Sequence, residues 1–587
     1  MRIIKIKNLL ILKIFNFLTK KQKNLLFIIL LLICFGAVLE LISVLIIIPF
    51  VNLLIGEDLP QIATNIFLLF NINLDKFMIN DLILFTGILV LSTSLFSSSY
   101  RILLSIIKEK YISKIINFLS TLAFTNIINQ RYSWHLKHES SELIVKLDCI
   151  DNISSRIIGP LLVIFTSLIS SIIILTGMLI YDPFTTFISI FLVSIIYYLI
   201  IIWCKNRLDI NALGRIEERK KVIKLMKDSF SGIRELIMNN ESDFVIKPYS
   251  ISDKKLRNFY AEAGYLGICP KYLVEFLAIL MIIIIGISTM SSTNKTDTVI
   301  TALAFFSFSL LKIIPHVQSF YSSITSIRAN KRSLTEFIEL LSLNNFYPNK
   351  KHNTGNNSIY ELLVSNISFK YSTNKEVLFR NLSLKFSKGD FIVLTGKSGA
   401  GKTTLSDLLM GLIEPDSGEY FFKYKTNKLK INSFNLRESS VHVPQEVFLF
   451  SDSLINNILR GSPLNKILLE KALYASCLDE FIYDLPNGMN TQLGERGALV
   501  SGGQRQRIGL ARAIYKILID NKFLLFLDES TSALDTITEK EVILRLKKIL
   551  KNKIIIAISH RENTFSLFNR VINLNLLSKT KENLENK

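Results

Sequence analysis

Two glycine-rich segments in the C-terminal half carry residues that can hold and cleave a phosphate anhydride. The first, GKSGAGKTT at residues 396–404, fits the pattern G-x-x-x-x-G-K-[ST]. In this loop backbone amides surround nucleotide phosphates, Lys402 reaches the β- and γ-phosphates, and the Thr403 hydroxyl binds Mg²⁺. The second segment, VSGGQRQRIGLARA at residues 500–513, stands shortly before FLLFLDES at residues 523–530.

A phosphate-binding loop alone is compatible with many NTPase families, and the SGGQ string at residues 501–504 excludes most of them. Followed by an apolar strand that ends in Asp528 and Glu529, it is similar to the signature of the ATP-binding cassettes. The resemblance covers roughly residues 357–575. It implies an α/β P-loop nucleotide-binding domain with ATP and Mg²⁺ as cofactors.

The resemblance also implies which residues bind the metal ion and activate water. Asp528 would hold Mg²⁺ through water, with Thr403 and Gln445 as further metal-binding residues. Glu529 would polarise the attacking water as general base. Gln445, in the string VPQEVFLF, matches the loop glutamine that touches both Mg²⁺ and this water.

Two further residues complete the expected site. His560 follows the apolar run at residues 553–559 and matches the switch histidine that contacts the γ-phosphate. Tyr371 matches the aromatic residue that stacks on adenine, and we expect it ahead of the first strand pair. The other expected nucleotide-binding residues are Gly396, Lys397, Ser398, Gly399, Ala400, Gly401, Lys402 and Thr404.

The signature string implies a second chain. Ser501, Gly502, Gly503 and Gln504 open a predicted helix, so the first amides of that helix form a second anion site. In the family this site binds the γ-phosphate held by the opposite cassette. Because one chain has one cassette, the resemblance implies a homodimer in which both sites hydrolyse ATP.

The N-terminal half is too apolar for an ordinary soluble domain. Mean hydropathy of the whole chain is +0.37, and 49% of its residues are hydrophobic. Stretches of at least about 18 residues can cross a bilayer, and six are present at residues 25–50, 82–107, 157–181, 184–204, 266–290 and 298–320. The sequence therefore predicts a membrane domain that is all-α, with six helices, the third and fourth joined as a hairpin by Asp182 and Pro183.

Charge predicts the orientation in the membrane. The first 25 residues are basic, whereas residues 56–81 hold four carboxylates against one lysine. By the positive-inside rule the N-terminus and residues 108–156 and 205–265 are cytoplasmic. We expect a multi-pass protein of the cytoplasmic (inner) membrane, in contact with membrane lipids, with its ATP-binding domain in the cytoplasm.

The chain has a net charge of +21, and basic residues on the cytoplasmic side of the membrane are expected to account for it. No RNA- or DNA-binding motif accompanies it, so we expect no nucleic-acid partner. The five cysteines lie in spans or on the cytoplasmic side without a CxxC pair, which predicts reduced, structural thiols.

The two cytoplasmic segments resemble the long intracellular loops of ABC exporters, which end in short coupling helices that lie on the cassettes. We expect those helices near residues 130–137 and 228–234. The string GERG at residues 494–497 matches a loop that exporter cassettes have and importer cassettes lack. The resemblance therefore implies export.

Several strings of the membrane half resemble the PglK-type lipid-linked oligosaccharide flippases. They are residues 36–50, 132–144, 231–249 and 269–276. The resemblance implies that a polyprenyl-diphosphate oligosaccharide, or a similar amphiphilic glycolipid, moves from the inner to the outer leaflet. Residues 61–72 fit the short external helix that contacts the lipid tail in that group, and fit equally a helix packed on its own bundle.

A diphosphate that crosses a bilayer needs positive partners, and Arg101, Lys271 and Lys312 are the basic residues in or beside spans two, five and six. Lys312 lies about fourteen residues, or about 20 Å, into its span. Arg101 and Lys271 are nearer the cytoplasmic edge and can snorkel to water. Lys271 can also pair with Glu275, and we expect Glu40 to make an interhelical hydrogen bond.

Two other functions stay open at this point. A peptide or drug exporter would share the cassette, although processing peptide exporters carry an N-terminal Cys/His protease domain and only about 24 residues precede the first span. An ATP-gated channel or regulatory subunit would not need Glu529 and His560. The predicted organisation is a transmembrane domain (residues 1–343), a polar linker (344–358) and an ATP-binding domain (359–587).

Overall fold

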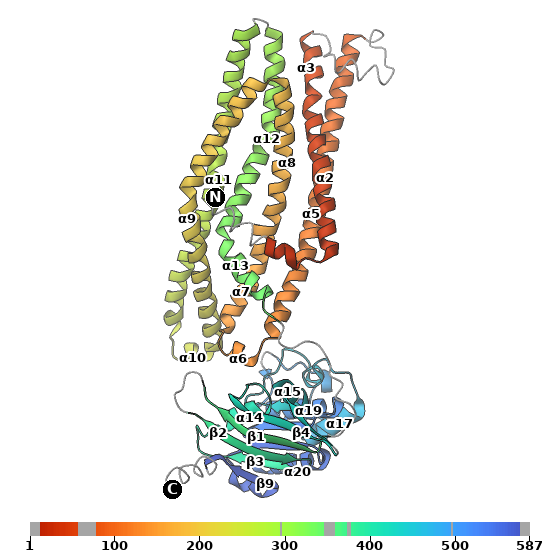
Figure 1. Ribbon diagram of the computed structural model, residues 1–587, viewed down its shortest axis with the longest axis vertical. Helices are drawn as coiled ribbons and strands as arrows, with labels where there is room; N and C mark the ends of the chain where they lie inside the picture. Colours follow the sequence, from red (N-terminus) through yellow and green to blue (C-terminus); the bar gives the residue numbers. More distant parts are fainter. Residues whose placement is uncertain are drawn as a thin grey trace. The chain divides into compact units, whose positions relative to one another are not determined.

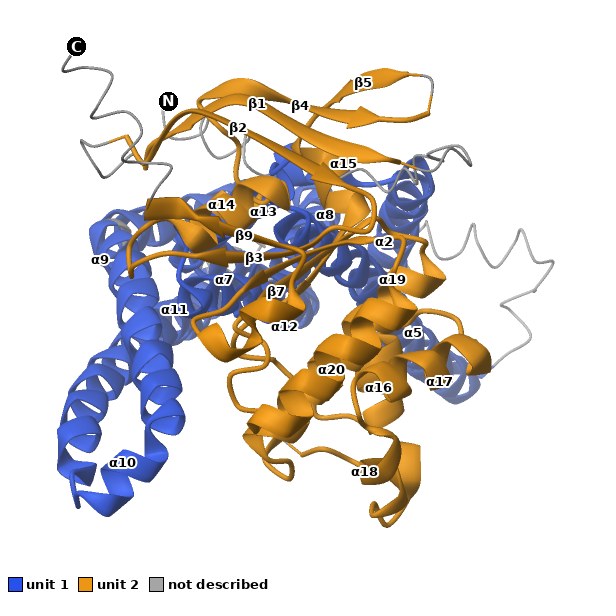
Figure 2. Ribbon diagram, turned by 90° about the horizontal axis from the view of Figure 1, so that it is seen from below, with its two compact units in different colours: residues 1–130, 134–348 blue, residues 131–133, 349–587 orange. Residues whose placement is uncertain are grey.

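The computed structural model describes residues 12–56, 78–293, 296–344, 359–371, 377–425, 427–494 and 497–575. The chain forms two compact units, which Figure 2 shows in different colours. Unit 1 comprises residues 1–130 and 134–348, and unit 2 comprises residues 131–133 and 349–587. The expected external helix at 61–72, residues 345–358 of the expected linker, and Glu495 and Arg496 of GERG lie outside the described residues.

Unit 1 is helical in its described part, where six helical segments are long and apolar enough to cross a membrane (Figure 1). The predicted six-helix membrane domain is therefore confirmed. Its main helices are α2 (Lys20–Leu45), α3 (Ile47–Ile55), α5 (Ile79–Ile128), α7 (Ser140–Ile153), η2 (Ser154–Ile158), α8 (Gly159–Tyr181), α9 (Pro183–Ser231), α10 (Ile233–Met238), α11 (Ser242–Thr293), α12 (Thr296–Ala329) and α13 (Lys331–Leu341). The short helix α6 (Tyr132–His135) begins in residues assigned to unit 2 and ends in unit 1.

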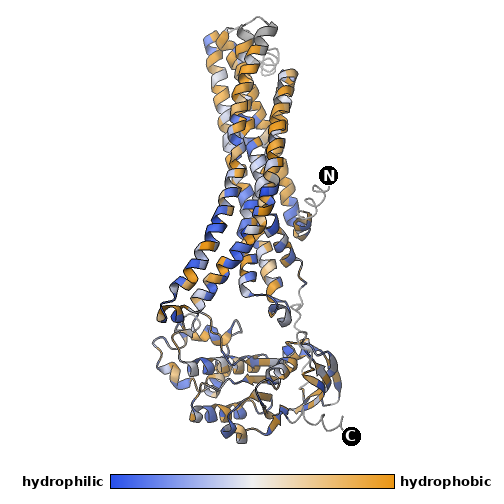
Figure 3. Ribbon diagram, turned by 90° about the vertical axis from the view of Figure 1, so that its left-hand side faces the viewer, coloured by the Kyte–Doolittle hydropathy of each residue, from blue (hydrophilic) through white to orange (hydrophobic). Residues whose placement is uncertain are grey.

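Three of these helices are much longer than the bilayer. Helices α5, α9 and α11 have 50, 49 and 52 residues. At 1.5 Å per residue each spans about 75 Å, against about 30 Å for the hydrocarbon layer. Figure 3 shows hydrophobic residues dominating one end of the long helices and hydrophilic residues gathering toward the other. The predicted spans are thus the apolar parts of longer helices.

The turns between helices follow local sequence signals. Asp182 caps α9 by accepting hydrogen bonds from the backbone N–H groups of Phe184 and Thr185, and Pro183 occupies the first helical position. The predicted hairpin is therefore present. Helix α6 lies within the predicted stretch 130–137, but α10 begins at Ile233, later than the start of the predicted 228–234, because α9 continues to Ser231.

Unit 2 is an α/β domain with two sheets. An antiparallel sheet has the order β2-β1-β4-β5, and a parallel sheet has the order β6-β7-β8-β3-β9. The strands are β1 (Glu361–Phe369), β2 (Phe379–Ser387), β3 (Phe391–Thr395), β4 (Ser417–Lys423), β5 (Lys428–Ile431), β6 (Ser440–Val443), β7 (Leu524–Asp528), β8 (Ile554–Ile558) and β9 (Arg570–Asn573). The helices are α14 (Lys402–Leu409), α15 (Ser433–Ser439), α16 (Leu454–Leu459), α17 (Lys466–Ala475), α18 (Asp479–Tyr483), α19 (Gly502–Ile519), α20 (Thr536–Ile549) and the 3₁₀ segments η3 (Gly488–Asn490) and η5 (Glu562–Leu567).

The central parallel strands position the expected chemistry. Strands β3, β7 and β8 are runs of apolar residues that are buried almost throughout, as strands covered on both faces must be. They are neighbours in the sheet, with β8 between β7 and β3. Their carboxyl ends lead into the phosphate-binding loop, into Glu529 and toward His560. Ligands bind at this edge of parallel sheets.

Candidate functional site

A cavity of about 590 Å³ lies at the carboxyl ends of these strands. It brings together most of the residues that the sequence predicts for an ATP site. Its lining residues are Tyr371, Val377, Leu378, Ser398, Gly399, Gly401, Lys402, Thr403, Thr404, Gln445, Asp528, Glu529, Ile558 and His560.

Glycine is required where the phosphate-binding loop enters α14. Gly401 has a φ of 89°, and a Cβ there would lie 2.8 Å from Cζ of Phe379. The Lys402 Nζ donates to the carbonyl oxygens of Gly396 and Lys397 at 2.8 and 3.1 Å. Gly396, Lys397 and Ala400 therefore shape the loop, although they are not among the residues that line the cavity.

The three predicted catalytic side chains meet at the end of β7. Nε2 of Gln445 donates to Oε2 of Glu529 at 2.9 Å, and Nε2 of His560 lies 3.3 Å from Oε1 of the same carboxylate. Glu529 has a φ of 44°, a left-handed conformation that is uncommon for a residue with a side chain. The backbone turn thus directs this carboxylate toward two residues that are distant in sequence.

Two carboxylates beside the phosphate-binding loop are poorly solvated. Burial raises the pKa of Asp528, and the negative charge of Glu529 raises it further. Burial also raises the pKa of Asp407 to about 6, with a smaller contribution from Asp528. The sequence analysis missed Asp407, although its spacing from Thr403, one turn earlier in α14, places the two on one helix face.

These oxygen-bearing side chains fit a divalent cation that arrives with a nucleotide. Mg²⁺ is commonly held by one or two carboxylates together with phosphate oxygens and water. Among the described residues, no group of three or more His, Cys, Asp or Glu side chains could hold a metal ion alone. Thr403, Gln445 and Asp528 all line the cavity, so they would complete the coordination that phosphates begin.

The signature string forms a capped helix start. Oγ of Ser501 accepts from the N–H of Gln504 at 3.2 Å, and Oε1 of Gln504 accepts from the N–H of Ser501 at 2.8 Å. Ser501 and Gly502 are exposed. The residues lining the cavity of the same chain do not include Ser501, Gly502, Gly503 or Gln504.

Tyr371 lies at the cavity, but its place in the sheet differs from the prediction. The residue follows β1, so the expectation that it precedes the first strand pair is wrong. The alternation of buried side chains through Leu362 and Val364 places the first strand earlier than we expected. The hydroxyl of Tyr371 lies 2.9 Å from Oγ1 of Thr404, which anchors the ring beside the phosphate-binding loop.

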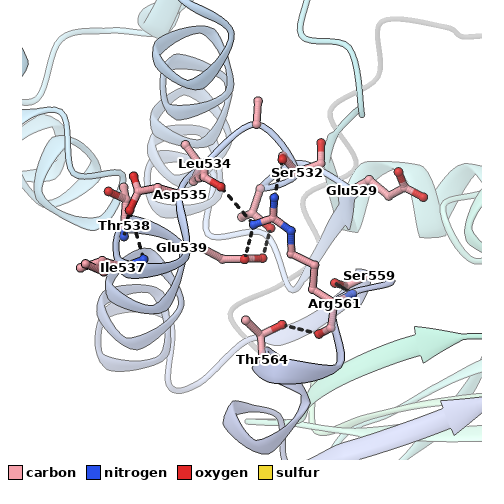
Figure 4. Close-up of polar contacts among 12 residues, drawn as sticks. Glu529, Ser532, Leu534, Asp535, Ile537, Thr538, Glu539, Ser559, Arg561 and Thr564 are labelled. Carbon is pink, nitrogen blue, oxygen red and sulfur yellow. Dashed lines mark hydrogen bonds and ion pairs between the residues drawn. The ribbon is translucent and has the colours of Figure 1, made fainter.

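An ion pair with a buried carboxylate holds the segment that follows Glu529 (Figure 4). The Arg561 guanidinium donates to the carbonyl oxygens of Ser532 and Leu534 at 2.6 and 3.0 Å, and it binds Oε2 of Glu539 at 2.7 Å. The Glu539 side chain is 1% exposed and accepts from Oγ1 of Thr531 at 2.7 Å. The sequence analysis missed this pair, whose members are separated by 22 positions.

A second charged cavity, of about 490 Å³, lies among the membrane helices of unit 1. Glu40 of α2 is only 3% exposed, and its carboxylate contacts Arg101 Nε at 3.1 Å and His316 Nε2 at 2.9 Å. The expected interhelical hydrogen bond of Glu40 is therefore present. His316 was missed; it lies one turn after Lys312 in α12, and its sequence context gives no sign of its distant partner.

The three basic residues predicted for substrate binding lie in different surroundings. Arg101 lines the charged cavity, and Lys312 is half-buried and close enough to Arg101 and Glu40 to interact electrostatically with both. Lys271 instead lies 3.7 Å from Glu275 on its own helix, with both side chains about half exposed. Another lysine, Lys108, lines the cavity and was not predicted.

Comparisons with known proteins agree with this architecture. Residues 26–268 match the model of the ABC transporter transmembrane region, and residues 379–532 match that of the ABC transporter. The chain is similar to the structure of a bacterial Atm1-family ABC exporter with ATP bound, with a TM-score of 0.75 and 18% identity over 95% of this chain and 96% of the other.

Sequence relatives are similar over different lengths. An export ATP-binding/permease protein of Rickettsia typhi is 27% identical over 81% of both chains. An ATP-dependent lipid A-core flippase of Pseudoalteromonas translucida is 40% identical, over 35% of this chain and 36% of the flippase. The α-hemolysin translocation protein HlyB of Escherichia coli O157:H7 is 38% identical, over 36% of this chain and 30% of HlyB.

A P-loop ATPase domain joined to a helical region with six spans defines an ATP-driven membrane transporter. The matched models cover both parts of this chain, and the fold is that of an exporter. The chain is an ABC transporter with the fold of an exporter: a multi-pass membrane protein with a cytoplasmic ATP-binding domain, whose ATPase activity is coupled to transport.

Proposed function

We propose that this exporter uses ATP to move an anionic glycolipid, of the polyprenyl-diphosphate oligosaccharide class, from the inner to the outer leaflet of the cytoplasmic membrane. The observation that carries this proposal is the charged cavity. Arg101 and Lys108 line it and Lys312 lies near, against one buried carboxylate, Glu40. Unpaired charge in a membrane interior is costly, so an excess of basic groups there fits an anionic ligand.

The sequence contributes a second support, independent of the cavity. The strings at residues 36–50 and 269–276 resemble PglK-type lipid-linked oligosaccharide flippases, and Glu40 lies in the first of them. Lipid A-core flippases, which by their name also move a lipid, are among the relatives that the chain matches over about a third of their length.

For the ATP site we propose roles that follow from the contacts. Glu529 is the general base, since a carboxylate held by Gln445 and His560 can accept a proton from a water molecule between them and the phosphates. Asp528, Thr403 and Gln445 bind Mg²⁺, which offsets the charge of the buried carboxylates. Tyr371 stacks on the base, and Lys402 leaves its carbonyl partners for the phosphates.

We also propose that two copies assemble into a homodimer. Ser501 caps the helix that Gly502 and Gly503 open; Ser501 and Gly502 are exposed, and none of the three residues lines its own chain's cavity. A helix N-terminus is a natural anion site. If the N-terminus of α19 faced the ATP cavity of a second copy, it would bind the γ-phosphate held in that cavity and complete the site.

Reconstituted transport tests the proposed cargo. Lys312→Ala should abolish flipping of a polyprenyl-diphosphate lipid in proteoliposomes and leave basal ATPase activity largely intact, because no ATP-site residue changes. Lys312→Arg should keep part of the activity, since it retains the charge with a different donor geometry. Lys271→Ala is the matched control and should flip normally, because Lys271 pairs with Glu275 on its own helix.

The same assay separates the alternatives. Normal flipping by Lys312→Ala would make Lys312 a structural residue and remove the main support for an anionic cargo. Transport of a peptide in place of the lipid would favour a peptide exporter. ATP-dependent ion flux without lipid movement would favour a gated channel.

A further inference from the structure

The carboxylate of Glu40 has more partners than a structural ion pair needs. Its Oε1 contacts Arg101 on α5 and its Oε2 contacts His316 on α12, while Ser170 on α8 lines the same cavity. Residues of four helices therefore surround one buried charge. Such a charge must keep at least one cationic or donating partner, because leaving it alone in the membrane interior is costly.

Arg101 is bound in a way that leaves its terminal groups available. Nε makes the ion-pair contact with Glu40 at 3.1 Å, and among the described residues no hydrogen bond from the terminal amino groups of Arg101 is present. The side chain is 47% exposed and lines the cavity. A planar guanidinium can bind a phosphate oxygen pair in bidentate geometry, which a contact through Nε alone does not use.

The charges around the cavity favour an anionic ligand. Helix α5 contributes Arg101 and Lys108, α12 contributes Lys312 and His316, and α2 contributes Glu40. Helix α8 contributes hydroxyl groups of Thr166, Ser167 and Ser170 to the lining, and no titratable side chain. With His316 neutral, Arg101, Lys108 and Lys312 outnumber Glu40 even though Glu109 offsets part of the charge of Lys108, so an anionic headgroup would balance the excess.

We propose that Glu40 is a displaceable counter-ion for Arg101, and that His316 takes up a proton when an anionic headgroup replaces Glu40 on the guanidinium. This inference rests on the proposed anionic cargo. Once Arg101 turns to the ligand, His316 is the partner still in contact with the Glu40 carboxylate, because Lys312 lies beyond ion-pair distance of it. A histidine beside a carboxylate that has lost its other positive partner binds a proton more tightly.

Ligand binding and proton uptake are then linked. A ligand whose binding takes up one proton gains affinity as the pH falls, by at most about tenfold per pH unit. Glu40→Gln removes the carboxylate that competes with the ligand for Arg101. The affinity of this variant for the anionic ligand should therefore be high, and it should vary with pH only as the ligand itself titrates. His316→Gln keeps a neutral hydrogen-bond donor beside Glu40 and cannot take up a proton. The affinity of this variant for the anionic ligand should therefore remain low as the pH falls.

The test measures binding of geranylgeranyl diphosphate to the full-length protein in lipid nanodiscs at pH 6.5 and 7.5, with the uncharged alcohol geranylgeraniol and inorganic pyrophosphate as companion probes. The wild type should bind the diphosphate several-fold more tightly at pH 6.5. Glu40→Gln should bind at pH 7.5 at least as tightly as the wild type at pH 6.5, and His316→Gln should lack the extra pH dependence of the wild type. Lys271→Gln, altered outside the cavity, should match the wild type.

Two results would overturn the inference. One is a Glu40→Gln profile that equals the wild-type profile, and the other is a His316→Gln protein that keeps the full pH dependence. His316→Gln decides alone if Glu40→Gln does not fold. Lipid that binds with the expected pH dependence but is not flipped would contradict the proposed function and leave the inference intact, whereas a wild type that binds neither diphosphate probe would contradict both.

Discussion

The ATP site of unit 2 and the charged cavity of unit 1 place their functional residues in different ways. In the ATP site the key groups follow neighbouring strands of one sheet, and the phosphate-binding loop is a single run of nine residues, 396–404. In the membrane cavity the contacting residues Glu40 and His316 are 276 positions apart. The residues of a site that is built from sequence motifs can be identified from the sequence, whereas the residues of a site that helix packing brings together can be identified only from the structure.

The two regions also treat buried charge differently. In the ATP site Asp528 and Asp407 have raised pKa values, because they are buried beside other acidic groups, and a bound cation would relieve them. In the cavity Glu40 already has two partners within the chain, the Arg101 guanidinium and the His316 ring. The ATP site therefore has uncompensated acidic groups that a cation would neutralise, whereas the membrane cavity has an excess of basic groups.

The largest expected effect is on ATP hydrolysis. Glu529→Gln should lower turnover by about a hundredfold or more, the range for loss of general acid–base catalysis, while ATP still binds and traps a cassette dimer. Steady-state ATPase and ATP-binding measurements check both halves of this prediction. Glu438→Gln, which alters an exposed carboxylate on α15, should hydrolyse ATP normally. Near-normal turnover in Glu529→Gln would place the base on another residue.

A second test asks whether the ATP site needs two chains. Lys402→Ala and Ser501→Arg should each be inactive, but co-assembly should give heterodimers with one site made of two intact halves. If chains mix at random, ATPase activity should recover to roughly a quarter of the wild-type value. A co-assembled sample no more active than either variant alone would show that the signature and the loop do not share a site.

The pair of Arg561 and Glu539 should affect rate more than binding. Arg561→Ala should lower kcat by about tenfold, because the segment after Glu529 loses its anchor and the geometry around the reacting groups loosens. The KM for ATP should change little, since Arg561 does not line the cavity. Arg561→Lys should restore part of the rate.

A double variant separates positioning from stability. Arg561→Ala leaves Glu539 buried without its cation, which should also lower the melting temperature. Arg561→Ala combined with Glu539→Gln should recover melting temperature without recovering kcat. If rate and stability recovered together, the pair would be merely structural.

The smallest predicted effect is a pH dependence of stability. Because the pKa of Asp407 is raised from its usual 3.8 to about 6, stability associated with its neutral form is present at low pH and is lost as the pH rises through about 6. Asp407→Asn should therefore stabilise the nucleotide-free, metal-free protein at pH 8. After allowance for solvent screening the gain is about 1 kcal/mol, and it should shrink at pH 5. Thermal unfolding at both pH values checks this, and an equal gain at both would refute it.

The sequence predicted most of the ATP site because its residues lie in short motifs tied to apolar strands. It predicted the six spans because about 18 apolar residues in a row are rare elsewhere. It did not predict the Arg561–Glu539 pair or the contact of His316 with Glu40, because such pairs depend on how helices and strands pack. The prediction that Tyr371 precedes the first two strands was wrong, because strand boundaries depend on which side chains are buried, and the local sequence alone does not show this.

The most direct test of the account is the ATPase rate of the reconstituted protein with and without a polyprenyl diphosphate. The account predicts that the diphosphate lipid stimulates the wild type, that the uncharged polyprenol does not, and that Lys312→Ala keeps its basal rate without stimulation. Equal stimulation by the charged and uncharged lipids, or full stimulation of Lys312→Ala, would contradict the claim that the basic cavity recognises the cargo.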